Sequence, residues 1–428
     1  MSENFSGPRK PVKHHMGRRC FNWDYSSRCI YMITITLADR SQPVLGQLVG
    51  EGEEWRIEPS EIGLIVEQCW REIPQQWPGV EIIESQLMPE HFHGIIFVKE
   101  EQKKKLGNII GSFKSKSTSR AGAVGLWAPG YVDLILFRAG QLEKMIAYIR
   151  DNPRRLGIKR ARPELFKVAR DIEIDFAARG EAQNRARGEA QGHGFGEGGS
   201  APARVRAGIP PWRGPATGHF MAIGNHFLLT RPVICQIQCS RSYFAYKRQR
   251  LPGGWQICRD STGKPVVEKS TPEFEEKAAA AMRAAAKGAV LLSPCISHGE
   301  REIARRAFEA GHRVITLQNK GFSPLYKPGG KLFETCAAGN LLMLAPIGWP
   351  YVPGEKAMTR HEAQVLNRIA QLIADDGAVE IDYKGVVLSG IDEAVAQAVA
   401  GEDFAARGKA QDSARGEAQN PAVKRAEI

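Results

Sequence analysis

The apolar positions between residues 29 and 153 switch repeatedly between a strand-like and a helical pattern. β-Branched and aromatic runs at residues 29–38, 80–88, 92–98 and 131–137 predict strands, and residues 44–58 predict a hairpin around Gly50. Apolar residues at helical spacing predict helices at 59–74, 102–120 and 140–152, the last stopped by Pro153. This alternation predicts an α+β, ferredoxin-like domain at residues 30–170, an antiparallel sheet with helices on one face.

A second alternation of apolar runs and amphipathic stretches occupies residues 219–395. Strands are predicted at 288–297, 312–319 and 340–346, with helices at 298–311 and 331–339 between them. Such spacing favours parallel βαβ crossovers and a doubly wound, Rossmann-like α/β domain. Ser293, Ser297, Gly299 and residues 327–330 could form an anion-binding rim at the carboxyl ends of its strands. Ser297 followed by Glu300 also fits a plain capping box at the start of a helix.

Three segments lack the apolar residues that a core requires. Residues 1–29 are predicted to be a basic flexible tail, residues 171–218 a disordered linker and residues 396–428 a disordered tail. The linker carries the tandem octapeptides "ARGEAQNR" and "ARGEAQGH", and the pattern returns at residues 404–419. An eight-residue period with so little to bury cannot build a folded solenoid.

Charge and composition narrow the classes of partner. The 428 residues have a formal net charge of +12, concentrated in basic clusters at residues 9–19, 103–120 and 154–162. These clusters suggest a polyanionic partner, although solvated basic faces would look the same. We expect a cytoplasmic, nucleoid-associated protein without membrane contact, because no signal peptide or spanning run is present.

The sequence "MPEHFHGIIF" carries two histidines inside a strand-like run. Residues two apart on a strand project to the same face, so His91 and His93 should converge while Phe92 packs on the opposite face. Two imidazoles at this spacing can bind one divalent ion. A core histidine beside an unrelated second one would explain the same letters.

The helical stretch "MIAYIRDNP" adds chemistry to the histidine pair. Tyr148 and Asn152 are four apart and therefore on one helical face, with Arg150, Arg154 and Arg155 nearby. A metal held by two imidazoles and an amide oxygen, a phenol nucleophile and guanidinium groups for phosphates would together support phosphoryl transfer. Taken alone, Tyr148 is better explained as a core tyrosine of an amphipathic helix.

With "HFH" and "YIRDNPRRLG" in this order, the segment from Ile30 to Lys167 resembles the HUH-type single-tyrosine transposases of small bacterial insertion sequences. It is most similar to their REP-associated tyrosine transposase relatives, which act on hairpin-forming repeats. The resemblance implies that His91, His93 and Asn152 hold Mg²⁺ or Mn²⁺ while Tyr148 attacks single-stranded DNA, giving a 5′-phosphotyrosine link and a free 3′-hydroxyl. It also implies palindromic DNA hairpins as partners and a homodimer.

The basic side chains around these motifs are the expected DNA contacts. They are Lys103, Lys104, Lys105, Lys114, Lys116, Arg120, Arg150, Arg154, Arg155, Lys159 and Arg160. A replication initiator or relaxase with the same chemistry, or a hairpin-binding regulator that has lost strand transfer, remains an alternative. The segment "LLSPCISHGEREIARRAFEAGHRVITL" is similar to the Rossmann-like core of the DNA-processing protein A family, which implies a DNA- or partner-binding accessory domain.

Overall fold

The computed structural model describes Cys20 and residues 23–176, 215–239, 243–251, 254–259, 265–353, 357–374 and 391–400. The chain divides into two compact units, residues 1–161 and 162–428. Residues 1–19, 177–214 and 401–428, which hold most of the predicted tails and linker, lie outside the described residues. Within the described part, no helix combines the length and apolarity needed to cross a bilayer.

The first unit is built on a four-stranded antiparallel sheet with strand order β4-β5-β1-β6. Its strands are β1 (Cys29–Thr36), β4 (Val80–Met88), β5 (His91–Val98) and β6 (Val132–Leu136). A separate hairpin pairs β2 (Gly46–Val49) with β3 (Arg56–Pro59). The predicted antiparallel sheet is therefore present. Its strands place alternate residues on two faces, and both faces are covered.

One face of this sheet packs on α1 (Glu61–Arg71), α2 (Ile73–Gln76) and α3 (Leu106–Arg120). Three fully buried rings form the centre: Trp70 lies 5.0 Å from Phe92 and 5.1 Å from Phe113, measured between ring centroids. Helix α1 begins where the Ser60 side chain accepts a hydrogen bond from the Gly63 amide. Phe92 thus occupies the face predicted for it.

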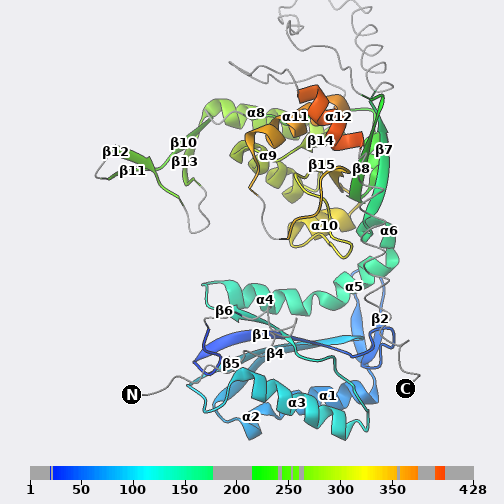
Figure 1. The fold of residues 1–428 in the computed structure, drawn as a ribbon, viewed down its shortest axis with the longest axis vertical. Helices are drawn as coiled ribbons and strands as arrows, with labels where there is room; N and C mark the ends of the chain where they lie inside the picture. Colours follow the sequence, from blue (N-terminus) through cyan, green and yellow to red (C-terminus); the bar gives the residue numbers. More distant parts are fainter. Residues whose placement is uncertain are drawn as a thin grey trace, which may run out of the picture. The chain divides into compact units, whose positions relative to one another are not determined.

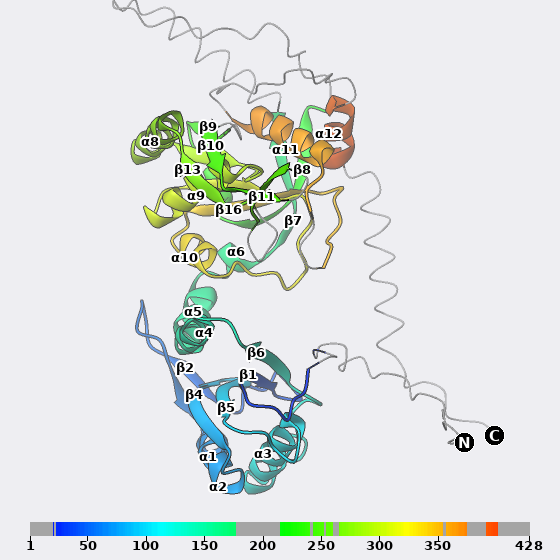
Figure 2. The ribbon, with the colours of Figure 1, turned by 90° about the vertical axis from the view of Figure 1, so that its left-hand side faces the viewer.

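The opposite face packs on α4 (Gln141–Arg150), which corrects the prediction that all helices lie on one face (Figures 1 and 2). Ile149 of α4 is fully buried against Met32 and Ile95, which alternate along their strands with residues of the first core. Both faces of the sheet carry apolar residues, so other elements must pack against each face. Helix α4 therefore lies on the face that carries His91 and His93.

Helix α5 (Asn152–Ala161) continues the path of α4 after a break at Asp151. Pro153 has no amide hydrogen to donate to the preceding turn, which accounts for the break. A Cβ atom at Gly157 would lie 2.1 Å from the Trp55 ring, so glycine allows α5 to approach the β2–β3 hairpin. This contact holds the basic helix beside the histidine face.

The second unit contains a six-stranded sheet with strand order β7-β8-β16-β15-β14-β9. The strands are β7 (Ala169–Asp175), β8 (Thr217–Gly224), β9 (Ile234–Gln236), β14 (Val290–Ser293), β15 (Val314–Leu317) and β16 (Leu341–Pro346). Strands β9, β14, β15 and β16 are parallel, as the alternation predicted, whereas β8 and β7 are antiparallel additions. Chain order and spatial order coincide among the described parallel strands, so the reversal expected of a doubly wound sheet is missing there.

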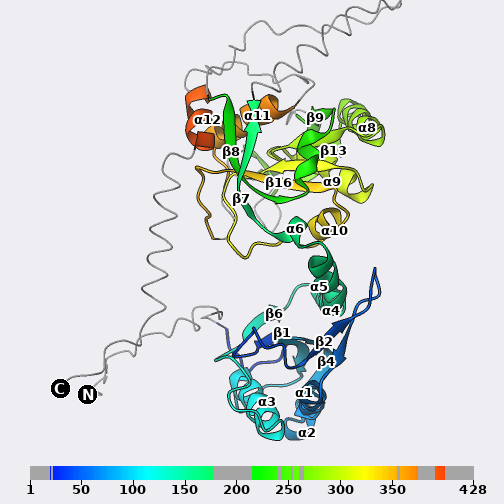
Figure 3. The same ribbon diagram turned by 90° about the vertical axis from the view of Figure 1, so that its right-hand side faces the viewer.

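Helices cover both faces of this second sheet (Figure 3). Helices α8 (Pro272–Ala286) and α9 (His298–Glu309) pack against Leu291 and Val314 on one face. Helices α11 (Arg360–Ile373) and α12 (Ile391–Ala400) pack against Leu292 and Ile315 on the other. Short segments complete the unit: α6 (Pro163–Phe166), η2 (His226–Thr230), α10 (Lys331–Ala337), β10 (Phe244–Tyr246), β11 (Arg248–Leu251), β12 (Gly254–Ile257) and β13 (Val267–Ser270).

The boundaries of the second unit differ from those expected at residues 171, 219 and 396. The unit begins at Arg162, because Phe166 stacks on Phe333 at 4.9 Å and β7 extends the second sheet. Residues 171–175, assigned to the linker, are therefore a strand. Helix α12 extends to Ala400, with Val399 fully buried. In both segments apolar residues alternate with charged ones, so the overall composition does not reveal where the second unit begins and ends.

Candidate active site

The paired histidines of β5 converge on the face covered by α4. Their ring centroids are 4.7 Å apart, and the two Nε2 atoms are separated by 3.1 Å. This is the geometry that the spacing within "HFH" predicts, because Phe92 between them packs on the other face. His93 is 5% exposed, so its ring is almost completely shielded from bulk water.

Burial also decides the charge of both rings. It lowers the pKa of His91 to about 4, with further lowering by the positive charges of Arg40 and Lys159. It lowers the pKa of His93 to about 3, with a smaller contribution from His91. Both rings are therefore neutral at neutral pH and can offer a nitrogen lone pair to a cation.

A neighbouring strand orients the inner histidine. Thr34 of β1 pairs directly with His93 across the ladder, and its Oγ1 atom lies 2.9 Å from His93 Nδ1. This hydrogen bond allows Nδ1 to carry the ring proton and leaves the Nε2 lone pair facing His91. Thr34 cannot be identified from the sequence, because only the strand register shows which β-branched residue faces the histidine.

The outer histidine has a weaker partner. Glu90 Oε1 lies 4.0 Å from His91 Nδ1, too far for a hydrogen bond, and Glu90 forms an ion pair with Arg40. His91 Nδ1 has no hydrogen-bond partner among the described residues. Two further carboxylates of this unit have hydroxyl donors: Asp133 accepts a hydrogen bond from Tyr25, and Asp39 accepts one from Ser41.

The predicted nucleophile lies beside this pair. The Tyr148 ring centroid is 6.1 Å from that of His93, and the side chain is 39% exposed. The Arg155 guanidinium lies 5.9 Å from the centre of the Tyr148 ring. An exposed phenol therefore lies between a guanidinium group and the buried, neutral imidazole of His93.

The donor set fits a divalent ion, although not as a complete cage. Two nitrogen ligands about 2.1 Å from one ion lie about 3 Å apart in neighbouring positions, close to the separation of the two Nε2 atoms. Asn152 is buried, and its Nδ2 atom has no hydrogen-bond partner among the described residues. In the described residues, no group of three His, Cys, Asp or Glu side chains could hold a metal.

The predicted DNA contacts on α4 and α5 lie on the same side of the sheet as the histidines. Arg150 pairs with Glu84 at 2.5 Å, and Arg154 pairs with Asp151 at 2.6 Å and with Glu53 at 2.8 Å. Lys159 is close enough to affect the charge of His91, and Arg160 is exposed. The ion pairs anchor α4 and α5 to strand β4 and to the loop between β2 and β3.

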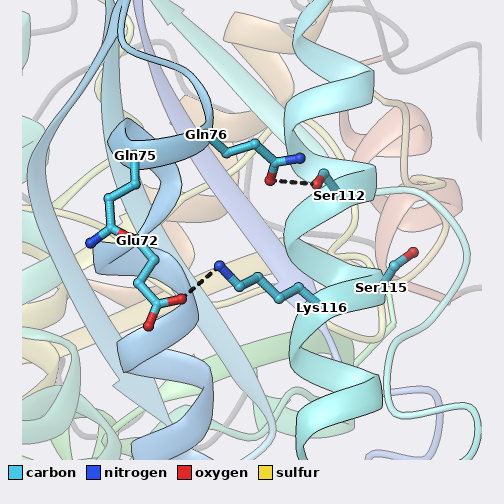
Figure 4. Close-up of a pocket in the computed structure, with 6 residues that line it drawn as sticks. All are labelled: Glu72, Gln75, Gln76, Ser112, Ser115 and Lys116. Atoms are coloured by element: carbon cyan, nitrogen blue, oxygen red, sulfur yellow. Dashed lines mark hydrogen bonds and ion pairs between the residues drawn. The ribbon is translucent and has the colours of Figure 1, made fainter.

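Three other predicted contacts lie on α3, across the sheet from the histidines. Lys116 and Arg120 pair with Glu72 at 2.6 and 2.7 Å, which lowers the pKa of that carboxyl to about 2. Figure 4 shows Lys116 and Glu72 lining a shallow depression with Gln75, Gln76, Ser112 and Ser115. Lys114 donates to the carbonyls of Ala128 and Gly130. The structure therefore does not bring these three cations to the histidine site.

The lysine triplet is also separated from the histidines. Lys103, Lys104 and Lys105 are exposed and follow the end of β5 that is remote from His91. A strand rises about 3.3 Å per residue, so the eight residues of β5 put its far end roughly 23 Å from His91.

The loop after β14 is satisfied by its own side chains. Buried Glu300 accepts hydrogen bonds from the Ile296 amide and the Ser293 hydroxyl, and Ser297 caps the first turn of α9. A carboxylate therefore occupies the position that an anion would need, and burial raises its pKa. The anion-binding rim expected here is not available.

Comparisons with known proteins give limited matches. No protein-family model matches the chain. An uncharacterised protein of Haemophilus influenzae is 26% identical over 166 residues, which cover 33% of this chain and 89% of that protein. A REP-associated tyrosine transposase bound to a REP hairpin matches at a TM-score of 0.27 and 17% identity, covering 32% of this chain and 74% of the other. A Deinococcus radiodurans protein assigned as a transposase matches at a TM-score of 0.20 and 16% identity, with 32% and 96% coverage. At such low TM-scores, the geometry of the site must carry the functional argument.

Proposed function

We propose that the first unit cleaves and rejoins single-stranded DNA at hairpin repeats, as a transposase with a tyrosine nucleophile. The observation that carries the proposal is the convergence of two neutral imidazoles, 3.1 Å apart at Nε2, beside the exposed Tyr148 ring. A purely structural histidine pair would not need an accessible phenol next to it. A pure DNA-binding surface would not need buried neutral rings.

His91, His93 and the Asn152 amide would hold Mg²⁺ or Mn²⁺, with water and phosphate oxygens as the remaining ligands. Such an ion supplies positive charge to the scissile phosphate and favours the ionised form of a nearby phenol. Histidine nitrogens suit Mn²⁺ better than Mg²⁺, so we expect Mn²⁺ to bind more tightly. Thr34 keeps the His93 ring in the orientation that this binding requires.

Tyr148 performs the covalent step. Its Oη atom attacks the phosphorus, so an O–P bond forms as the bond from phosphorus to the 3′-oxygen breaks. The phenol loses its proton and the departing 3′-oxygen gains one, leaving a 5′-phosphotyrosine and a free 3′-hydroxyl. Attack by a 3′-hydroxyl of another strand reverses these changes, so one phosphodiester replaces another without a nucleotide cofactor.

The arginines and lysine beside the tyrosine position the DNA strand. Arg155 lies against the Tyr148 ring, and Lys159 adds positive charge near His91. Both can bind phosphates next to the attacked one, because guanidinium and ammonium groups form charge-assisted hydrogen bonds with phosphate oxygens. The proposal gives no direct role to Lys114, Lys116 and Arg120, and the predicted homodimer stays a prediction.

The test is adduct formation with end-labelled hairpin oligonucleotides from the genomic neighbourhood of the gene, with Mg²⁺ or Mn²⁺. We expect a covalent protein–DNA adduct from the native protein and none from Tyr148→Phe, which lacks the attacking oxygen. His93→Ala should slow adduct formation ~100-fold or more, since it removes charge stabilisation from the phosphate. Chelation of the metal should have a similar effect.

Tyr351→Phe is the matched control, because Tyr351 is another exposed tyrosine, 46% accessible, in the second unit. It should form adducts at the native rate. Tight hairpin binding without any adduct would reject strand transfer and leave a DNA-binding regulator. Cleavage of unstructured origin sequences in preference to hairpins would instead favour an initiator or relaxase.

A further inference from the structure

A β-ribbon in the second unit has two chemically different faces, and neither covers a core. Among the described strands, β11 and β12 pair only with each other, and they extend away from the central sheet (Figure 1). All the side chains described on this ribbon are exposed. An isolated two-stranded ribbon is only marginally stable in water. The stability of the fold therefore does not explain which side chains this ribbon carries.

The register assigns the side chains to faces. Arg248 is opposite Ile257 and Arg250 is opposite Trp255, and these cross-strand pairs share one face. Gln249 is opposite Gln256 on the other face. One face therefore combines two guanidinium groups with an indole and an aliphatic side chain, while the other carries two amides.

The apolar members of the first face are unusually accessible. Trp255 is 68% exposed and Ile257 is 41% exposed. Large apolar side chains that are neighbours on a surface commonly mark a binding site. An indole beside an arginine is suited to a flat, apolar ring that carries a negative group close by.

The ribbon and the residues beside it are positively charged, which favours a negatively charged partner. Residues 243–259 contain four basic residues, Lys247, Arg248, Arg250 and Arg259, and no acidic residue. Within the described residues, no carboxylate pairs with Arg248 or Arg250. An unpaired nucleotide offers both a base whose face can stack and a phosphate one sugar away.

The ribbon is held firmly enough to present this face. At its base, β10 pairs with β13, and Phe244 packs on Phe274 of α8 with ring centroids 4.6 Å apart. Backbone hydrogen bonds from Cys258 to Lys247 and from Val266 to Cys258 link this base to the ribbon. Backbone pairing therefore connects the core of the second unit to the ribbon at Arg248.

We propose that this ribbon binds unpaired DNA, with Trp255 stacked on a base and Arg248 and Arg250 bound to adjacent phosphates. The binding site lies in the second unit and is independent of strand transfer, so it would operate even in a chain whose tyrosine is inactive. It would give the chain a second contact with single-stranded DNA outside the catalytic unit.

The test measures binding of the full chain, carrying Tyr148→Phe and in the presence of a chelator, to labelled oligothymidine of about 20 nucleotides. Trp255→Ala should weaken binding about 5- to 100-fold, and Trp255→Phe should retain most of it, because stacking needs an aromatic face. Arg248→Ala combined with Arg250→Ala should reduce the slope of log affinity against log salt by about 1.4. Gln249→Ala combined with Gln256→Ala, on the opposite face, should change neither quantity.

Equal affinity of all these variants for oligothymidine would overturn the proposal. An equal loss of binding to a perfect duplex would also overturn it, because paired bases do not expose their faces. If Trp255→Ala reduced binding to vesicles of anionic lipid but not to DNA, the surface would be a membrane contact instead. Because strand transfer is disabled in every variant, these outcomes do not depend on the catalytic proposal.

Discussion

At the scale of single residues, the histidine site depends on a threonine that performs no chemistry. Thr34 is the only side chain with a described hydrogen bond to a Nδ1 atom of the histidine pair. A hydrogen bond at Nδ1 decides which ring nitrogen is available to a metal. The orientation of His93 Nε2 toward a metal therefore depends on the hydrogen bond between His93 and Thr34.

Thr34→Val should weaken Mn²⁺ binding and slow adduct formation about 10- to 100-fold, since the isosteric side chain cannot hydrogen-bond to His93. Titration calorimetry of the metal and the rate of adduct formation would measure both effects. Thr34→Ser keeps the hydroxyl and should remain close to the native protein. Native metal affinity in Thr34→Val would mean that packing alone orients the ring.

The basic side chains show what a list of charges omits. Arg155 and Lys116 are equally cationic in the sequence, yet Arg155 lies against Tyr148 whereas Lys116 pairs with Glu72 on the far side of the sheet. Glu72 is more than forty residues from Lys116 in the chain. The ion pair between Lys116 and Glu72 forms because α3 packs beside α1, and the local sequence does not specify this packing.

At the scale of elements, the two faces of β5 impose opposite demands. His91 and His93 lie on the face that also carries Ile95 and packs on α4, whereas Phe92 and Gly94 belong to the face packed on α1 and α3. A Cβ atom at Gly94 would lie 2.1 Å from the buried Trp70 ring. Glycine at this strand position therefore lets the indole pack against the backbone directly beneath the histidines.

Gly94→Ala should destabilise the first unit by about 1–3 kcal/mol, because the indole must shift within a packed core. The free energy of unfolding, from urea denaturation, would measure this change. Gly111→Ala is the control, because Gly111 lies in α3 with nothing within 4 Å of an added Cβ atom. That substitution should stabilise the helix by up to about 1 kcal/mol. Equal stability of the two variants would contradict the packing described for Trp70.

At the scale of the whole molecule, each unit has a core of its own. The core around Trp70 and Phe92 uses only residues of the first unit, and the core around Phe220 and Leu366 uses only residues of the second. Units with separate cores commonly unfold as separate cooperative transitions.

We therefore expect two transitions in a calorimetric scan of the full chain. Gly94→Ala should lower the midpoint of only one of them, by roughly 2–12 °C, because its strain is confined to the first core. Mn²⁺ should raise the midpoint of the same transition, since a ligand stabilises the unit that binds it. A single transition that responds to both changes would mean that the units unfold together.

The sequence by itself predicted most elements of the first unit and named the residues of its candidate site. Period-two alternation places His91 and His93 on one face because that rule depends only on backbone geometry. The single helix predicted through Tyr148 and Asn152 is instead divided at Asp151 into α4 and α5. Only the tertiary structure decided that α4 covers the histidine face, that Thr34 orients His93 and that α3 lies across the sheet. Those contacts join residues far apart in the chain, so they follow from packing two apolar faces at once rather than from any local pattern.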